Sequence, residues 1–185
     1  RNPHPAYVRA MLRFEFAIIF ALWAAAQAAV QRGDLHKALN TTEDIWLKQR
    51  SYNILHHTCV RHKKEFLNET DYVFHETYQH SDAQTQTELH AKLHDHQTPP
   101  YMVVSLQQGS TTGLQYTLQY WDDDDKCGVL TFEHTTDGRQ CEMHVWDSNI
   151  GGSQSECEAQ YKALCPGTPY VVYPPDCRSQ ADGNN

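Results

Sequence analysis

The stretch from Cys141 to Asp147 holds the residue types best suited to chemistry, because apolar and polar side chains alternate along it. In a strand, this period of two places Glu142, His144 and Trp146 on one face. If that face points inward, a carboxylate and an imidazole are buried beside an indole. A buried carboxylate can pair with a cation, and an imidazole can donate to a hydroxyl or a carboxylate. The pattern therefore indicates a ligand-binding cavity.

Other interpretations of the polar residues have to be weighed against this one. Glu142 and His144 could pair with each other or face solvent, because the two faces of a strand are easily exchanged. The four aspartates at 122–125 lack the ligand spacing of a calcium loop and are expected to form a solvated turn. The twelve histidines are scattered, so no metal site is predicted. No phosphate loop or nucleophile elbow occurs, so neither an enzyme nor a cofactor is expected.

The strand that carries Glu142 is one of about eight predicted strands, at the spacing of a sandwich or barrel. They are expected at residues 45–52, 56–64, 71–78, 85–93, 101–106, 114–120, 127–132 and 141–146. Residues 31–39 are amphipathic and predict a helical turn or two. A helix capped by Ser153 or Ser155 should follow the last strand and end at Pro166.

The N-terminal part of the chain predicts a signal peptide at residues 11–28, with a basic start, a short apolar run and small residues near Ala28. Residues 1–10 are then expected to be upstream, non-native sequence. Residues 29–177 form the predicted single domain, and the polar residues 178–185 are expected to be a disordered tail. A secreted, extracellular and soluble protein is the expectation.

Cysteine count and charge agree with an extracellular location. The six cysteines are an even number, which implies three disulfides, although fifteen pairings are possible. The formal net charge of −8 disfavours nucleic acid and anionic membranes as partners. Asn40 and Asn68 each begin a glycosylation sequon and are expected at the surface.

Several motifs in this order and spacing resemble the tick salivary lipocalins, the histamine-binding-protein family. The motifs are Leu39–Leu47, Thr58–Arg61, Tyr120–Asp122 with Lys126–Cys127, Cys141–Asp147, Cys157 with Tyr161 and Cys165, and Val172–Tyr173 with Cys177. The resemblance spans essentially the whole chain after the signal peptide. It implies an all-β fold with one C-terminal helix, in the form of an eight-stranded antiparallel lipocalin barrel.

The resemblance also implies disulfides and a function. It pairs Cys59 with Cys177 and Cys127 with Cys157, which leaves Cys141 for Cys165. It implies a secreted, monomeric, non-enzymatic protein of tick saliva that sequesters a small host mediator in its barrel and so evades host defence. The expected mediator is a biogenic amine such as histamine or serotonin. The alternatives are an eicosanoid such as a leukotriene, or a complement or other protein target bound through loops.

Individual residues fit these ligand classes differently. Glu142 matches an inward acidic residue of the histamine binders, whereas Gly128 stands where two-site histamine binders carry an acidic residue. His144 lies in a run similar to that of leukotriene binders, and Arg50 or Arg61 could pair with a lipid carboxylate. Glu76 and the tyrosines at 72, 78, 101, 116 and 120 are further candidates for the amine site. The ligand-binding residues that we predict are Glu142, His144, Trp146, Tyr116, Phe74 and Trp46, the last expected to plug one end of the barrel.

Overall fold

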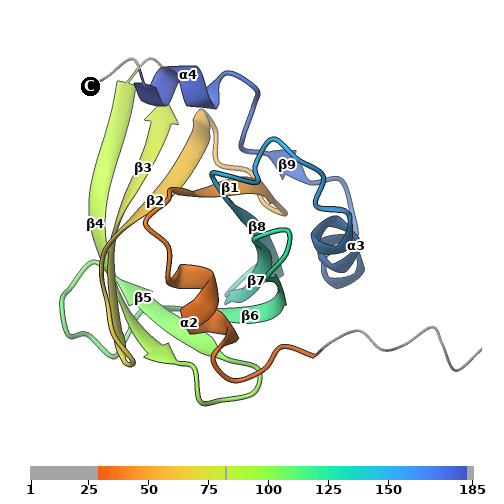
Figure 1. Cartoon of the computed structure of the whole chain (residues 1–185). Helices are drawn as coiled ribbons and strands as arrows, with labels where there is room; N and C mark the ends of the chain where they lie inside the picture. Colours follow the sequence, from red (N-terminus) through yellow and green to blue (C-terminus); the bar gives the residue numbers. More distant parts are fainter. Residues whose placement is uncertain (1–28, 82, 183–185) are drawn as a thin grey trace, which may run out of the picture.

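The computed structural model describes residues 29–81 and 83–182, in which eight antiparallel strands form a closed barrel (Figure 1). In chain order they are β1 (Ile45–Arg50), β2 (His57–Leu67), β3 (Asp71–His80), β4 (Ala83–His94), β5 (Tyr101–Ser105), β6 (Leu114–Asp122), β7 (Cys127–His134) and β8 (Gly138–Trp146). The barrel closes because β1 pairs with β8 on one side and with β2 on the other. This architecture confirms the predicted eight-stranded barrel.

The first strand is shorter than its sequence pattern predicts. β1 ends at Arg50, and Ser51 and Tyr52, which the pattern placed in the strand, lie in the connection to β2. The Arg50 guanidinium explains the break, because it donates to the carbonyl oxygens of Tyr52 and Ile54 and so holds the following backbone in a turn. A two-residue strand, β9 (Tyr170–Val171), pairs with the end of β1.

In the described ranges, three short helices accompany the barrel: α2 (Asp34–Leu39), α3 (Ser155–Leu164) and α4 (Cys177–Asp182). α3 is the predicted C-terminal helix, but its N-cap is Gln154 and no serine side chain caps it. Within the described residues, no helix is both long and apolar enough to cross a bilayer. The predicted signal peptide and the residues before it lie outside the described part of the chain.

The C-terminal tail is more ordered than its composition predicts. Residues 178–182, expected to be disordered, continue α4. Two contacts fix this helix: the Cys59–Cys177 disulfide at its start, and the Arg178 guanidinium, whose Nε lies 3.2 Å from Asp147 Oδ1. Polar composition did not reveal that these two tertiary contacts would offset the entropy of ordering the tail. Residues 183–185 lie outside the described part.

α3 lies outside the barrel beside β7 and β8 (Figure 1), and a disulfide-rich core fills the space between this helix and the barrel wall. The Cys127–Cys157 and Cys141–Cys165 disulfides join β7 and β8 to α3, and with Cys59–Cys177 they give the pairing that the resemblance implied. Met143, Val145 and Tyr161 fill the space between these bridges. The outward face of β8 is therefore dry and covalently fixed.

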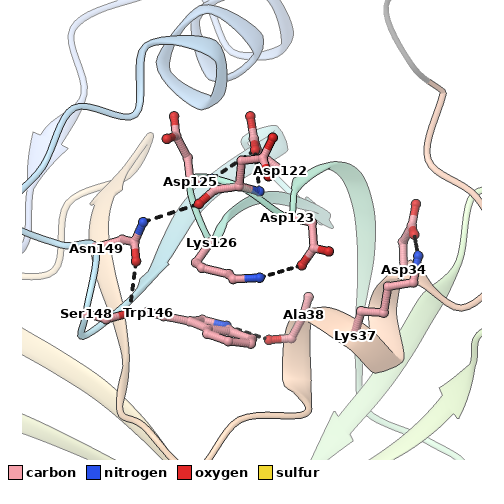
Figure 2. Close-up of polar contacts among 11 residues, drawn as sticks. Asp34, Lys37, Ala38, Asp122, Asp123, Asp125, Lys126, Trp146, Ser148 and Asn149 are labelled. Carbon is pink, nitrogen blue, oxygen red and sulfur yellow. Dashed lines mark hydrogen bonds and ion pairs between the residues drawn. The ribbon is translucent and has the colours of Figure 1, made fainter.

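One end of the barrel is covered by α2, which lies across the opening in Figure 1. Asp95 accepts hydrogen bonds from the first amides of this helix, those of Leu35 and His36. Near its other end, the Ala38 carbonyl oxygen accepts a hydrogen bond from Trp146 Nε1 at 2.9 Å, shown in Figure 2. These contacts attach α2 to both the β4–β5 connection and β8.

The four aspartates form the β6–β7 turn, as predicted. Asp122 Oδ1 accepts hydrogen bonds from the amides of Asp124 and Asp125, both at 3.0 Å. Lys126 pairs with Asp123 at 2.7 Å, and its ammonium lies 5.2 Å from the centre of the Trp146 ring (Figure 2). In the described part of the chain, no group of three or more His, Cys, Asp or Glu side chains is placed to hold a metal ion.

Candidate functional site

The barrel encloses a cavity of about 220 Å³. Its two ends differ in chemistry and can be located along β1. At the start of this strand Ile45 lies opposite Trp146, and at its end Arg50 lies opposite Glu142. The end beneath α2 is mainly apolar. The opposite end, beneath the connection between β1 and β2, is polar and is lined by Arg50, Tyr52, His57, His62, Glu76, Glu142 and His144.

The inward face of β8 supplies the centre of the polar end. Glu142 and His144 are 5% and 8% exposed, and both line the cavity with Trp146. Met143 and Val145, which alternate with them, face the disulfide-rich core instead. The polar residues of β8 therefore point into the cavity and the apolar ones point outward, as the cavity interpretation requires. Tyr116 and Phe74 line the same cavity from β6 and β3. Five of the six residues predicted as ligand-binding therefore surround one space.

Trp46 is the exception, and the prediction that it lines or plugs the cavity is wrong. Its neighbours Ile45 and Leu47 line the cavity, so alternation turns Trp46 to the outside of β1. There it packs edge-on against Tyr173 with ring centres 4.9 Å apart, and its Nε1 donates to Asp147 Oδ1 at 2.7 Å. Trp46 is buried, but in the outer core.

Glu142 is hydrogen-bonded through both of its carboxylate oxygens. Its Oε1 accepts a hydrogen bond from the Tyr52 hydroxyl, and its Oε2 lies 2.9 Å from His144 Nε2. A second pair lies alongside: His62 Nε2 is 3.1 Å from Glu76 Oε2, and the rings of His62 and His144 are 5.2 Å apart. Two carboxylates and two imidazoles thus meet inside the barrel from β2, β3 and β8.

The protonation of this cluster follows from burial and hydrogen bonding. Burial lowers the pKa of His144, so its imidazole is neutral at neutral pH and donates to Glu142. Burial alone raises the pKa of Glu142, but the hydrogen bonds from His144 and Tyr52, together with the electrostatic influence of the imidazoles of His144 and His62, outweigh it and hold that pKa below its ordinary value. Burial, with the Glu142 charge nearby, raises the pKa of Tyr52, which keeps its phenol protonated. Glu142 is therefore an anion bonded to two neutral donors.

Arg50 lies in the cavity wall and is only 2% exposed, yet no carboxylate binds it in the described structure. Its guanidinium donates to the carbonyl oxygens of Tyr52, Ile54 and His57, each at 3.1 Å, and contacts His57 Nδ1 at 3.0 Å. These contacts occupy most of its five N–H donors. Arg61, the other basic residue considered, faces outward and pairs with Asp44 at 3.1 Å.

Sequence reasoning left several lining residues out of the predicted set. Tyr52 was missed because the pattern placed it in a strand, whereas the turn made by Arg50 directs it toward Glu142. His62 was missed although it alternates with buried Val60, and that alternation was the available signal. Glu76, considered as an addition, does line the cavity. Of the tyrosines considered with it, only Tyr116 does; Tyr72, Tyr78, Tyr101 and Tyr120 pack elsewhere.

Comparison with known proteins relates this geometry to a family. A family model described as tick histamine binding protein matches residues 23–179. The solved structures that resemble the chain include the serotonin complex of AM182, at 16% sequence identity and a TM-score of 0.62. That match covers 83% of this chain and 97% of the other.

A second similar structure is Japanin from Rhipicephalus appendiculatus bound to cholesterol. It shares 13% sequence identity at a TM-score of 0.58, with 73% of this chain and 95% of the other covered. At these identities the two structures establish the fold, which is the predicted lipocalin barrel. A search of curated protein sequences gives no match.

Proposed function

Because the chain belongs to the tick histamine-binding protein family, we propose that its cavity captures a small biogenic amine. The family and the barrel make it a small-ligand-binding lipocalin. The choice of an amine rests on one observation: Glu142 is a buried carboxylate in the cavity wall, and within the described residues no lysine or arginine pairs with it. An ammonium group that enters the cavity supplies the missing positive charge.

The rest of the polar end suits such a cation. A buried ion pair is favourable only when further hydrogen bonds satisfy both partners. Glu76 provides a second carboxylate, and the rings of Phe74 and Tyr116 provide aromatic faces for cation–π contact. The amine would therefore exchange its water shell for oxygen atoms and ring faces already in place.

Cavity size favours the same ligand class. Pockets for drug-sized ligands typically have volumes of roughly 300–1,000 Å³. The cavity of about 220 Å³ is smaller and suits a compact aromatic amine better than an extended lipid.

The eicosanoid alternative is supported by the apolar end of the cavity. Leu35, Leu39 and Ile45 line this end and could hold an acyl chain. A lipid carboxylate also needs a cation, however, and the Arg50 guanidinium already binds three backbone carbonyl oxygens. The amine is therefore the first candidate and the eicosanoid the second.

Calorimetry with histamine, serotonin and a leukotriene tests the proposal. We expect at least one amine to bind, and the Glu142→Gln variant to bind it about 100-fold more weakly, because the ammonium loses its anionic partner. Glu133→Gln is the matched control, since Glu133 is an exposed residue of β7 and the substitution changes the net charge equally. Leukotriene binding without amine binding would replace the first candidate with the second.

The biological setting is part of the same proposal. Three disulfides suit an oxidising extracellular space, and the sequon residues Asn40 and Asn68 are both exposed. We infer that the protein is secreted as a monomer and removes a host mediator at the feeding site. Mass spectrometry of protein from a secreting eukaryotic host tests signal cleavage near Ala28 and glycan occupancy together.

A further inference from the structure

The connection between β1 and β2, residues 51–56, separates the cavity from solvent. We call it the β1–β2 segment. Tyr52 and Ile54 line the cavity from this segment, and Ile54 and Leu55 are also 43% and 69% exposed. It contains neither strand nor helix, so its backbone can move without breaking the barrel's hydrogen-bond ladder.

The segment is held at its base by contacts to the barrel. Ser51 N donates to the Cys141 carbonyl oxygen at 3.0 Å, and Cys141 N donates to Ser51 Oγ at 2.8 Å. Further along, the buried Arg50 guanidinium binds the carbonyl oxygens of Tyr52 and Ile54. These contacts fix where the segment starts and how it turns.

The Tyr52 side chain adds a different kind of contact, because it reaches from the segment into the binding site. Its hydroxyl donates to Glu142 Oε1, while the other oxygen of Glu142 is engaged by His144. The Tyr52 ring packs edge-on against Phe132 with ring centres 5.5 Å apart. Both carboxylate oxygens therefore have a donor before any ligand enters.

We propose that Tyr52 is a latch, a residue that competes with the ligand for Glu142 and so couples amine binding to movement of the β1–β2 segment. The inference rests on the proposed amine function. In the empty cavity, the Tyr52 hydroxyl satisfies the carboxylate and holds the segment closed. An arriving ammonium takes Oε1, and Tyr52 with its segment is released.

The latch predicts that removing the Tyr52 hydroxyl strengthens amine binding, whereas removing a contact from a binding site usually weakens it. If the segment must open before the amine reaches Glu142, the measured affinity is the intrinsic affinity reduced by the fraction of open molecules. Tyr52→Phe keeps the ring on Phe132 but removes the competing hydroxyl. Affinity for the amine should then rise about tenfold, the scale of one hydrogen bond to a charged group. A tyrosine that merely contacts the ligand would give weaker binding when changed to phenylalanine.

Tyr116 offers a matched control for loop motion. It also lines the cavity and packs against Phe132, with ring centres 5.1 Å apart, but in the described structure it makes no hydrogen bond to Glu142. Without ligand, the Ser51 amide, which donates to the Cys141 carbonyl oxygen, should exchange its hydrogen about tenfold faster in Tyr52→Phe than in the wild type. In Tyr116→Phe, exchange at this amide should be unchanged.

The experiment combines calorimetry with histamine and serotonin and hydrogen exchange of the ligand-free proteins. Tighter amine binding and faster segment exchange in Tyr52→Phe would support the latch. Amine binding by the wild type, with equal or weaker binding by Tyr52→Phe, would overturn the latch and leave the proposed function standing. Unchanged exchange in Tyr52→Phe would also overturn it. If neither the wild type nor Tyr52→Phe binds an amine, the proposed function and the latch both fail.

Discussion

The two faces of β8 perform different tasks although they alternate along one strand. On the outer face, Cys141, Met143 and Val145 are fully buried against α3, and Cys141 forms a disulfide with Cys165. On the inner face, Glu142 and His144 border a cavity that leaves part of the interior unfilled. Adjacent residues in the sequence thus serve stability on one side and binding on the other.

The difference shows how a small barrel can remain folded around an empty space. An unfilled interior forfeits packing contacts, and buried polar groups add a desolvation cost. The outer face offsets this with a dry core and covalent bridges between the barrel wall and α3. Substitutions on the outer face should therefore change stability alone, and those on the inner face should change affinity.

The largest expected effect lies on the outer face. Replacing Cys141 and Cys165 with alanine opens a loop with a sequence separation of 24 residues, and the free energy of unfolding should fall by about 3 kcal/mol. Amine affinity of the folded variant should stay within about twofold of the wild type. Urea unfolding and calorimetry measure the two quantities. A large loss of affinity in a fully folded variant would show that the outer bridge positions Glu142.

Two tryptophans provide a sharper test of which face binds the ligand. Trp46→Phe and Trp146→Phe each remove one indole hydrogen bond, to Asp147 and to the Ala38 carbonyl oxygen respectively. Both should lower the free energy of unfolding by about 1 kcal/mol. Only Trp146→Phe should weaken amine binding, by roughly threefold to tenfold, because only Trp146 lines the cavity. Equal loss of affinity in both variants would contradict the assignment of Trp46 to the outer core.

The smallest expected effect concerns pH and the inner face. Burial lowers the pKa of His144 from its ordinary 6.5, so the unfolded chain binds more protons than the folded chain below that pH. Stability without ligand should therefore fall as pH falls through 6.5. The loss from pH 7.5 to pH 6.0 should stay below about 1 kcal/mol for this histidine, the limit for an imidazole that titrates only in the unfolded chain. Half-buried His57, whose pKa is lowered by burial and by the nearby Arg50 charge, should add a loss of the same sign.

The His144→Gln variant isolates the contribution of His144 to this slope. Its free energy of unfolding should depend less on pH over the same interval than that of the wild type. The carboxylates do not interfere, because Glu142 has a lowered pKa and its contribution is lost only below its ordinary value of 4.5. An unchanged slope in His144→Gln would show that His144 is not held neutral by burial.

The sequence indicated most of the barrel because its strands have a clear period of two and turns that are easy to identify. Asp137–Gly138 marked the β7–β8 hairpin, and the run of four aspartates marked the turn before β7. The boundaries failed where a long side chain overrode local preference. Arg50 ended β1 two residues early, and that change directed Tyr52 into the site.

By itself, the sequence determined which residues of β8 share a face, because alternation in an extended chain follows from backbone geometry. It did not determine which face looks inward for Trp46, since a buried indole suits a cavity and an outer core equally well. The tertiary structure decided that Trp46 faces outward, by placing Tyr173 and α3 outside the barrel. It also brought together Tyr52, Glu142, His62 and Glu76. Contacts between distant strands depend on barrel closure and register, which no local pattern of residues encodes.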